Sequence, residues 1–243
     1  IAVEKGLLVL TGGPGTGKTT TVKGIIQLMQ NRGLKIALAA PTGRAAQRME
    51  ELTGTAAKTI HRLLEVEYKE GENSQSFVHD MRNPLDYDAV IVDEMSMVDV
   101  NLFAALLDAL PLHCRLIMVG DSHQLPPVGA GNVLSDIIES NVIDVVTLDK
   151  IFRQAMKSKI VTNAHRVVKG KMPEFDNSSD SDFFLLKENN KYNLPKNVVE
   201  LVTSRLPVGY GFDAMNDIQV LCPGRKGETG TENLNAVLQA KLN

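Results

Sequence analysis

The sequence contains no tryptophan, two cysteines and only 5% aromatic residues, and each shortage argues against a class of protein. Cys114 and Cys222 lie far apart, without a C-x-x-C pair or a metal-ligand spacing. This excludes a disulfide-rich secreted domain and a cysteine metal site, and it favours a reducing, cytosolic compartment. The scarcity of aromatic side chains argues against a protein that binds by stacking bases on aromatic rings.

Long hydrophobic runs are missing as well. Charged residues and a proline interrupt the longest apolar stretches, at Asp99, Asp108, Pro111 and Arg115. These stretches end well before the roughly 20 residues that a membrane-spanning helix needs. No basic segment followed by an apolar, cleavable run opens the chain, so no secretory signal is visible. Because the chain starts at Ile1 and not at Met, we expect a fragment with natural sequence missing upstream.

The overall composition is that of an ordinary soluble globular protein. The chain has 243 residues, a net charge of −3, 43% hydrophobic and 23% charged residues. These values exclude disorder, collagen and a coiled coil. The length suits one large domain, or one domain and part of another.

Basic residues are concentrated in one stretch. Residues 15–62 hold eight Lys and Arg against two Glu, a net charge of +6 that leaves −9 for the rest of the chain. Local basicity within an acidic protein suits a groove for a polyanion. A solvated basic face explains the same count equally well.

Short β-branched runs alternate with segments of helical periodicity through the first two thirds of the chain. The expected strands are Leu7–Thr11, Ile36–Ala40, Ala89–Asp93, Arg115–Val119 and Val145–Leu148. The expected helices are Lys18–Gln30, Gly43–Leu52, Asp99–Leu110 and Gly131–Ser140. Such alternation predicts an α/β fold, in which helices cover both faces of a parallel sheet.

Two regions depart from this alternation. The polar stretch between Tyr68 and Asp86 is typical of a surface hairpin or loop insertion. Beyond residue 152 the pattern becomes sparse, and only part of a second sheet domain is expected. Its predicted elements are helices at 160–169, 195–206 and 231–242 and short strands at Phe183–Leu186 and Ile218–Cys222.

A phosphate-binding motif follows the first expected strand and opens the first helix. Residues Gly12–Thr19 read GGPGTGKT and fit G-x-x-x-x-G-K-[ST] without deviation. Glycines allow successive backbone N–H groups to point at the phosphates, and the helix N-terminus adds partial positive charge. We expect Lys18 to reach the β- and γ-phosphates and Thr19 to bind Mg²⁺ through its hydroxyl. The predicted nucleotide contacts are Gly13, Pro14, Gly15, Thr16, Gly17, Lys18, Thr19 and Thr20.

Two adjacent carboxylates, Asp93 and Glu94, end the expected strand at residues 89–93. The end of a parallel strand lies at the carboxyl edge of the sheet, beside the phosphate loop. Asp93 is then the partner of hydrated Mg²⁺, and Glu94 the group that orients and deprotonates the attacking water. An acidic helix cap is the alternative for the pair taken alone.

A third motif narrows the class of nucleoside triphosphatase. The guanine-reading Asn-Lys-x-Asp motif is absent, since Asn190–Asn193 reads NKYN, and so is the Leu-Ser-Gly-Gly-Gln signature of transporters. Gly120–Gly129 instead reads GDSHQLPPVG directly after a strand. We expect Gln124 to contact the γ-phosphate, while the following turn couples nucleotide state to a second ligand.

Taken in order, these motifs resemble the motor of RecD-like superfamily 1B DNA helicases, the family that includes the exodeoxyribonuclease V alpha subunit. The resemblance covers Gly12–Thr19 as motif I, Ala40–Ala46 as motif Ia and Thr59–Leu64 as the next DNA-side motif. It continues with Asp93–Met97 as motif II, Gly120–Gly129 as motif III and Ile151–Gln154 as motif IV. It implies a RecA-like ATP-binding lobe over residues 1–147 and an incomplete second lobe over 148–243.

The resemblance also implies a function and its residues. It implies an ATP- and Mg²⁺-dependent motor that moves 5′ to 3′ on single-stranded DNA, alone or with other subunits of a helicase–nuclease complex. Arg153 would reach the γ-phosphate, and its alternative is a surface ion pair. The DNA-side residues are Pro41, Thr42, Gly43, Arg44, Thr59, His61 and Arg62. An N-cap for Thr42 is compatible with this role, whereas an internal hydrogen bond is the favoured alternative for His61.

The chain also departs from the family pattern. The adenine-reading glutamine segment would lie before Ile1, and motifs V and VI would lie beyond Asn243. We therefore expect this chain to bind nucleotide with weak or absent turnover and no unwinding. Two other interpretations stay open: a non-motor ATP switch in a DNA-repair complex, and an RNA helicase.

Overall fold

The computed structural model describes residues 2–67, 76–150, 155–178 and 180–242. The chain divides into two compact units, Ile1–Phe183 and Phe184–Asn243, and each is described by itself. The expected lobe boundary between residues 147 and 148 stays a prediction. No helix among the described residues is both long and apolar enough to cross a bilayer.

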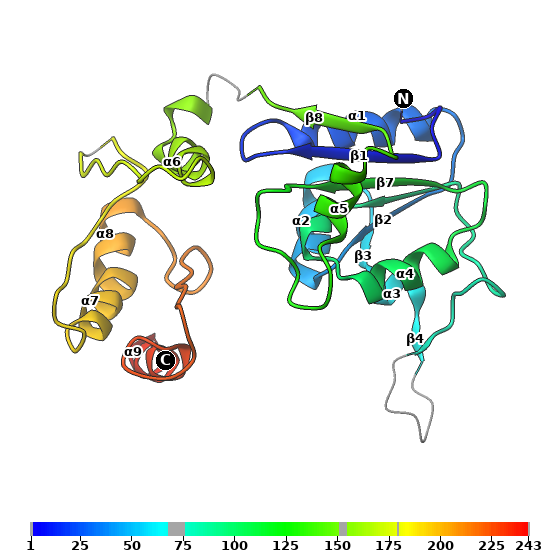
Figure 1. Ribbon diagram of the computed structural model, residues 1–243. Helices are drawn as coiled ribbons and strands as arrows, with labels where there is room; N and C mark the ends of the chain where they lie inside the picture. Colours follow the sequence, from blue (N-terminus) through cyan, green and yellow to red (C-terminus); the bar gives the residue numbers. More distant parts are fainter. Residues whose placement is uncertain (1, 68–75, 151–154, 179, 243) are drawn as a thin grey trace. The chain divides into compact units, whose positions relative to one another are not determined.

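A parallel sheet forms the centre of the first unit, as the sequence predicts, and it has six strands, one more than predicted (Figure 1). Its order is β3-β2-β6-β7-β1-β8, so that β1 lies between strands from much later in the sequence. The strands are β1 (Leu7–Gly12), β2 (Ile36–Ala40), β3 (Ala57–Thr59), β6 (Ala89–Val92), β7 (Arg115–Gly120) and β8 (Val145–Leu148). All pairings are parallel, with Leu7 opposite Leu116 and Val9 opposite Val145.

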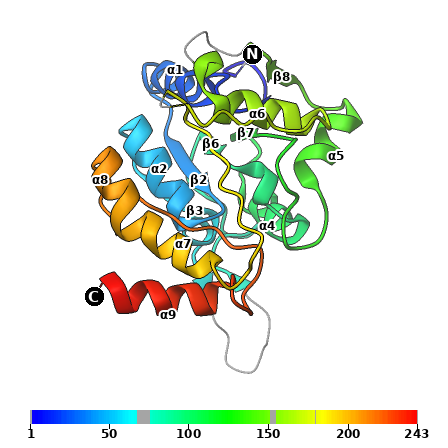
Figure 2. The ribbon, with the colours of Figure 1, turned by 90° about the vertical axis from the view of Figure 1, so that its left-hand side faces the viewer.

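Helices cover both faces of this sheet (Figure 2). One face carries α1 (Lys18–Gln30) and α2 (Gly43–Thr53), and the other carries α3 (Ile60–Leu64), α4 (Val100–Ala109) and α5 (Val133–Ser140). Successive strand residues point to opposite faces, so Leu8 and Leu10 pack under α1 while Val9 packs on the far side. Both faces are therefore apolar, which explains why the strands read as continuous hydrophobic runs.

The expected strands and helices of this unit are present, with small shifts of their ends. Strand β3 and helix α3 were not predicted, and they are only three and five residues long. Elements this short carry too little periodicity to be recognised. The Thr59 hydroxyl accepts a hydrogen bond from the Arg62 amide at 3.1 Å and so caps α3.

The predicted hairpin in the polar stretch is confirmed at its base. Strand β4 (Val66–Glu67) pairs antiparallel with β5 (Ser76–Phe77). Beyond the sheet, the first unit continues into a 3-10 turn, η2 (Ala155–Lys157), and helix α6 (Lys159–Val168).

The described residues of the second unit contain helices and no strand. Helix α7 (Leu194–Glu200) runs through a π-helical segment, η3 (Leu201–Arg205), into α8 (Leu206–Tyr210), and α9 spans Thr231–Leu242. Pro207 has no N–H for the preceding turn, which accounts for the widened π-helical stretch before it. The helices confirm the prediction for this region, with one continuing to Tyr210.

The two strands predicted near and within the second unit are wrong. Neither Phe183–Leu186 nor Ile218–Cys222 is a strand in the structure. In the described part of the chain, neither run pairs with a strand of either sheet, so neither joins a hydrogen-bonded ladder. Local apolar character alone suggested strands here.

Candidate nucleotide and nucleic-acid sites

The phosphate loop is the turn between β1 and α1, and close packing shapes it. A Cβ on Gly12 would lie 2.6 Å from the Leu148 carbonyl oxygen and 2.7 Å from the Thr16 hydroxyl oxygen. Gly17 occupies the N-cap of α1 with a φ of 89°, in the left-handed region where a side chain is strained. The two glycines thus allow the chain to reverse tightly and direct the first turn of α1 at the loop.

Side chains of the loop fold back onto its backbone. The Thr16 hydroxyl donates to the Gly13 carbonyl at 2.8 Å. The Lys18 ammonium donates to the carbonyls of Gly12 at 2.5 Å and Gly13 at 3.2 Å. The predicted phosphate-binding cation therefore lies inside the curl of the loop. Thr19 follows it in the first turn of α1 and is exposed.

The twin acids follow β6, as the sequence predicts. The Asp93 carboxylate accepts a hydrogen bond from the Glu94 amide at 2.8 Å. Glu94 has a φ of 55°, an uncommon conformation for a residue with a side chain. This sharp turn ends the strand and starts the 3-10 helix η1 (Met95–Met97).

Burial makes both acids weaker than ordinary carboxylic acids. Desolvation raises the pKa of Asp93, and the Glu94 amide, Lys18 and Arg48 oppose that rise. Desolvation and then the charge of Asp93 raise the pKa of Glu94, again against the two cations. A buried carboxylate with a raised pKa is a better proton acceptor, which suits the role predicted for Glu94.

One cavity of about 770 Å³ brings the predicted nucleotide residues together. It is lined by every predicted loop contact from Gly13 to Thr20, by both acids and by Gln124. The phosphate loop and the acid pair, on β1 and β6, thus face a common space across the carboxyl edge of the sheet. This is the arrangement that a bound metal triphosphate requires.

The turn after β7 places Gln124 at this cavity. Asp121 is 4% exposed, and its carboxylate accepts a hydrogen bond from the His123 amide at 3.0 Å. The backbone N–H of Gln124 in turn donates to the backbone carbonyl of Asp121 at 3.1 Å. The Ser96 hydroxyl donates to the side-chain oxygen of Gln124 at 3.3 Å, which links this turn to η1.

Ser96, Asp121 and Arg48 were not predicted individually as site residues. Ser96 reaches Gln124 through a contact that only the fold creates, whereas Asp121 bonds to Gln124 within a single turn of the chain. Arg48 was grouped with the basic stretch, yet it lines the cavity from the second turn of α2. The helical spacing of Ala45, Arg48, Met49 and Leu52 was the one sequence signal that these side chains share a face.

The predicted DNA-side residues gather at the carboxyl ends of β2 and β3. These strands pair in parallel, with Ala40 opposite Thr59, so both threonine turns emerge at the same edge of the sheet. Thr42 caps α2 by accepting a hydrogen bond from the Ala45 amide at 3.2 Å. Gly43, Arg44 and Arg62 are exposed, and Pro41 and Thr42 are partly exposed. A phosphate group can reach the first turns of both α2 and α3.

His61 has a packing role in the structure. Its ring lies 5.9 Å from that of Phe77, centroid to centroid, at the base of the β4–β5 hairpin. Its ring makes no hydrogen bond to another described residue, and both roles considered for His61 from the sequence stay predictions. With Phe77, Asp99 and Asn101, His61 borders a second hollow of about 420 Å³.

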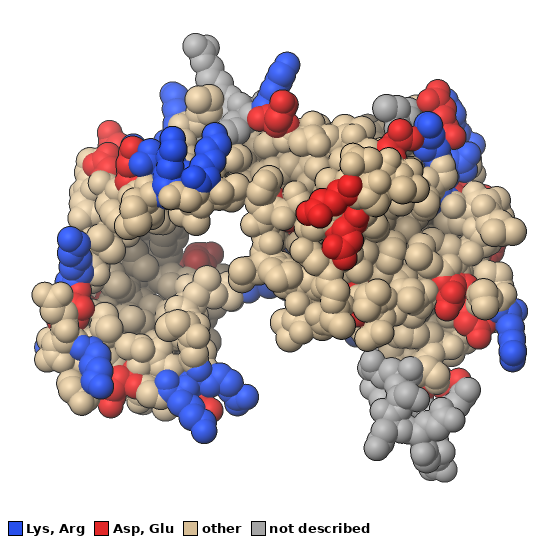
Figure 3. Space-filling model, in the orientation of Figure 1, with Lys and Arg blue, Asp and Glu red and all other residues tan. Residues whose placement is uncertain are grey.

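Acidic side chains lie over α5 on the face of the first unit seen in Figure 3. The basic stretch includes α1 and α2, which pack on the other face of the sheet. Helices α1 and α2 of the basic stretch and the acidic helix α5 thus lie on opposite faces of the sheet.

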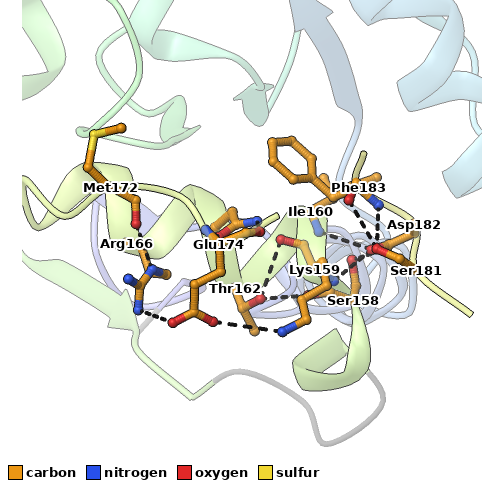
Figure 4. Close-up of polar contacts among 11 residues, drawn as sticks. Ser158, Lys159, Ile160, Thr162, Arg166, Met172, Glu174, Ser181, Asp182 and Phe183 are labelled. Carbon is orange, nitrogen blue, oxygen red and sulfur yellow. Dashed lines mark hydrogen bonds and ion pairs between the residues drawn. The ribbon is translucent and has the colours of Figure 1, made fainter. Parts of the chain in front are cut away.

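Helix α6 contacts the phosphate loop. His165 Nε2 lies 3.2 Å from the Pro14 carbonyl oxygen, and a Cβ on Gly13 would lie 2.8 Å from the same ring. The helix is braced by the segment that follows it (Figure 4). The Asp182 carboxylate accepts hydrogen bonds from the Ser158 hydroxyl and from two amides in the first turn.

Glu174, in the segment that follows α6, also bonds to the helix. Glu174 forms an ion pair with Arg166 at 2.8 Å, and buried Asn163 bonds both backbone groups of Glu174. These bonds hold the segment that follows helix α6 against the helix at two places. Arg153, predicted to reach the γ-phosphate, lies outside the described residues.

Comparison with known proteins gives a consistent family. A family model described as an AAA domain matches residues 1–130. The ATP-dependent RecD2 DNA helicase of Deinococcus radiodurans is 38% identical over 237 residues, covering 98% of this chain and 30% of that protein. The RecBCD enzyme subunit RecD of Mycolicibacterium smegmatis is 43% identical over 162 residues, covering 57% of this chain and 29% of that protein.

A solved structure shares the fold. The Pif1 helicase from Candida albicans matches with a TM-score of 0.50 at 24% identity, covering 69% of this chain and 42% of that one. The chain spans less than a third of the length of the two curated relatives above.

Proposed function

We propose that this chain, which belongs to the AAA domain family, is part of the motor of an ATP-dependent DNA helicase of the RecD type. The single observation that carries this proposal is the shared cavity at the carboxyl edge of the sheet. In that cavity, the phosphate loop, Asp93, Glu94 and Gln124 face one another. Motion from 5′ to 3′ along single-stranded DNA is part of the proposal and rests on the family resemblance.

The phosphate end of ATP would bind in the loop between β1 and α1. Backbone N–H groups and the start of α1 favour an anion there, and Lys18 supplies the positive charge. The Thr19 hydroxyl and the Asp93 carboxylate are hard oxygen donors that line the same cavity, a pair that suits Mg²⁺. When bound, Mg²⁺ neutralises charge that develops on the transferred phosphoryl group.

Glu94 would accept the proton of the attacking water. Its raised pKa, caused by burial and by Asp93, suits a general base, and its unusual backbone turn directs it from the end of β6. Gln124 would contact the terminal phosphate while the Ser96 and Asp121 hydrogen bonds hold its turn. Arg153 completes the proposed catalytic set.

Single-stranded DNA would lie along the ends of β2 and β3. The capped first turns of α2 and α3 offer amides to phosphates, and Arg44 and Arg62 add positive charge. Pro41, Gly43, Thr59 and His61 complete the proposed surface. Helix α2 spans from this surface to the ATP cavity, so closure on nucleotide can change the grip on DNA.

The first test is nucleotide binding by this chain. Wild type is expected to bind a non-hydrolysable ATP analogue with Mg²⁺, and Lys18→Ala is expected to weaken that binding by at least about tenfold, since one charged hydrogen-bond donor is lost. Lys23→Ala, an exposed lysine on α1 outside the cavity, is the matched control. Equal affinities for wild type and Lys18→Ala would contradict the proposal.

The second test separates a motor from an ATP switch and DNA from RNA. In the natural protein that carries this sequence, Glu94→Gln is expected to keep ATP binding and abolish DNA-stimulated hydrolysis. A wild type that binds ATP and assembles with partners but never hydrolyses it would instead indicate a switch. Stronger binding of RNA than of DNA with the same sequence, at matched salt, would contradict the DNA assignment.

A further inference from the structure

Arg48 is the second cation of the ATP cavity, and the mechanism above gives it no task. It extends from α2, on the helix face that also presents Ala45, Met49, Leu52 and Thr53 to the cavity. These positions recur at the three- and four-residue spacing that keeps side chains on one side of a helix. Arg48 is the charged member of that face and therefore the one able to bind an anion.

The two cations approach the cavity from different elements. Lys18 lies in the loop after β1 and points at the carbonyls of Gly12 and Gly13. Arg48 lies on α2, the helix that follows β2. Between them, β6 delivers Asp93 and Glu94. A triphosphate seated in the loop would place its terminal phosphate in the cavity that Lys18 and Arg48 both line.

The guanidinium of Arg48 is available for such a contact. In the described part of the chain, no acceptor lies within hydrogen-bond or ion-pair distance of it. The neighbouring acids of α2 are engaged elsewhere, because Glu51 accepts from Gln47 at 2.9 Å and Glu50 accepts from the Ala57 amide at 3.0 Å. A planar fork of donors suits phosphate oxygens better than a single ammonium does.

The field of Arg48 also reaches the acid pair. Its charge lowers the pKa values of both Asp93 and Glu94, against the larger effect of their burial. The guanidinium therefore acts on the same acids as Lys18, at the cavity where a terminal phosphate and its attacking water would lie.

We propose that Arg48 binds the terminal phosphate of a nucleoside triphosphate and so fixes α2 to the nucleotide; this inference rests on the proposed function. Helix α2 begins at the Thr42 cap, beside Arg44 on the proposed DNA surface, and reaches the cavity one turn later. A triphosphate therefore pins the helix that carries the DNA contacts, whereas a diphosphate leaves Arg48 without its partner. The alternative role, a DNA phosphate contact shared with Arg44, predicts different binding data.

The test compares nucleotides that differ in the terminal phosphate. Wild type, Arg48→Ala, Arg48→Lys and the control Arg32→Ala are titrated with fluorescent AMP-PNP and ADP at saturating Mg²⁺. Binding to a labelled single-stranded oligonucleotide is measured without nucleotide. Arg32 is exposed and lies outside the cavity, so it matches the change of charge. Thermal unfolding followed by circular dichroism checks that each variant folds.

We expect Arg48→Ala to lose about tenfold in affinity for AMP-PNP and less than about threefold for ADP, the difference reflecting one charge-assisted contact. Arg48→Lys should fall between wild type and Arg48→Ala, and DNA affinity should stay unchanged. Equal losses for AMP-PNP and ADP, or no loss for either, would overturn the assignment. A loss confined to DNA binding would also overturn it and assign Arg48 to the DNA surface. Failure of wild type to bind either nucleotide would overturn the proposed function itself.

Discussion

The hydroxyl of Ser96 donates a hydrogen bond to the side-chain oxygen of Gln124, across 3.3 Å. Ser96 is buried in η1, directly after the acid pair, and Gln124 lies in the turn that follows β7. The bond therefore ties the residues proposed to activate water to the turn proposed to sense the terminal phosphate. Removing it should separate nucleotide binding from its effect on DNA.

We predict that Ser96→Ala leaves the affinity for AMP-PNP within about twofold, because one neutral hydrogen bond contributes only about 1 kcal/mol and does not touch the phosphates. The affinity for single-stranded DNA is measured by fluorescence anisotropy with AMP-PNP and with ADP, and the difference between the two affinities should become smaller in the variant. Ser122→Ala, a neighbouring serine in the same turn, serves as the control. An unchanged difference between the two nucleotides would refute this coupling.

The close contact at Gly12 predicts a stability effect. Gly12→Ala would place a methyl group 2.6 Å from the Leu148 carbonyl oxygen, which belongs to a strand and cannot move away cheaply. We expect a loss of about 1–3 kcal/mol in the free energy of unfolding, the usual range for overpacking. Chemical denaturation measures it. Gly6→Ala meets no atom within 4 Å and should be close to neutral.

The contact between His165 and Pro14 predicts a local effect on dynamics. His165→Ala removes the ring that lies against the phosphate loop, so α6 should open more often. Hydrogen exchange followed by mass spectrometry should detect faster exchange in α6 and little change in α4. His113→Ala, outside this contact, is the matched control, and equal exchange in both variants would argue against the contact.

The two cysteines should differ sharply in reactivity. Burial, and next the charge of Asp88, raises the pKa of the Cys114 thiol to about 11, so it stays protonated at pH 8. Iodoacetamide should then label partly exposed Cys222 and spare Cys114 in the folded protein. In Cys222→Ser, labelling at pH 8 should appear only on unfolding, and rapid labelling of the folded variant would contradict the burial.

The Cys114 thiol also makes the free energy of unfolding decrease at high pH. Its pKa is higher in the folded chain than the ordinary value of 9.0, so folding favours the protonated form. This contribution is complete below pH 9 and is lost as the pH rises toward about 11. Cys114→Ala should flatten that part of the curve of unfolding free energy against pH.

The Thr42 cap of α2 predicts effects on both stability and DNA binding. Thr42→Ala removes the acceptor for the Ala45 amide and should cost about 1 kcal/mol of stability, whereas Thr42→Ser keeps the acceptor. If the first turn of α2 also holds a DNA phosphate, Thr42→Ala should weaken DNA binding as well. Stability and anisotropy measurements on both variants check this, and a stability loss with unchanged DNA affinity would restrict Thr42 to capping.

Much of the fold and site was predictable because its signals are local. The long strands are apolar on both faces, and the loop at Gly12–Thr19 carries its chemistry in consecutive residues. Asp93 and Glu94 were found because a strand end is a position that topology defines. These features need no knowledge of distant contacts.

What escaped prediction depends on contacts between segments far apart in the sequence. Ser96 meets Gln124, and His165 meets Pro14, only because the sheet and α6 bring them together. Strand β3 is too short to have a period of its own and exists by pairing with β2. Conversely, residues 218–222 have a strand-like composition but no strand to pair with in the described chain.

The position of β1 in the sheet has a consequence for synthesis on the ribosome. Both neighbours of β1 come late, β7 beginning at Arg115 and β8 at Val145, so β1 emerges before either of its partner strands in this sheet. The phosphate loop at its end can therefore take its final shape only after the nascent chain has extended past Leu148, which also packs on Gly12. Until then an apolar strand is exposed, and a slowly translated or truncated chain should depend on chaperones.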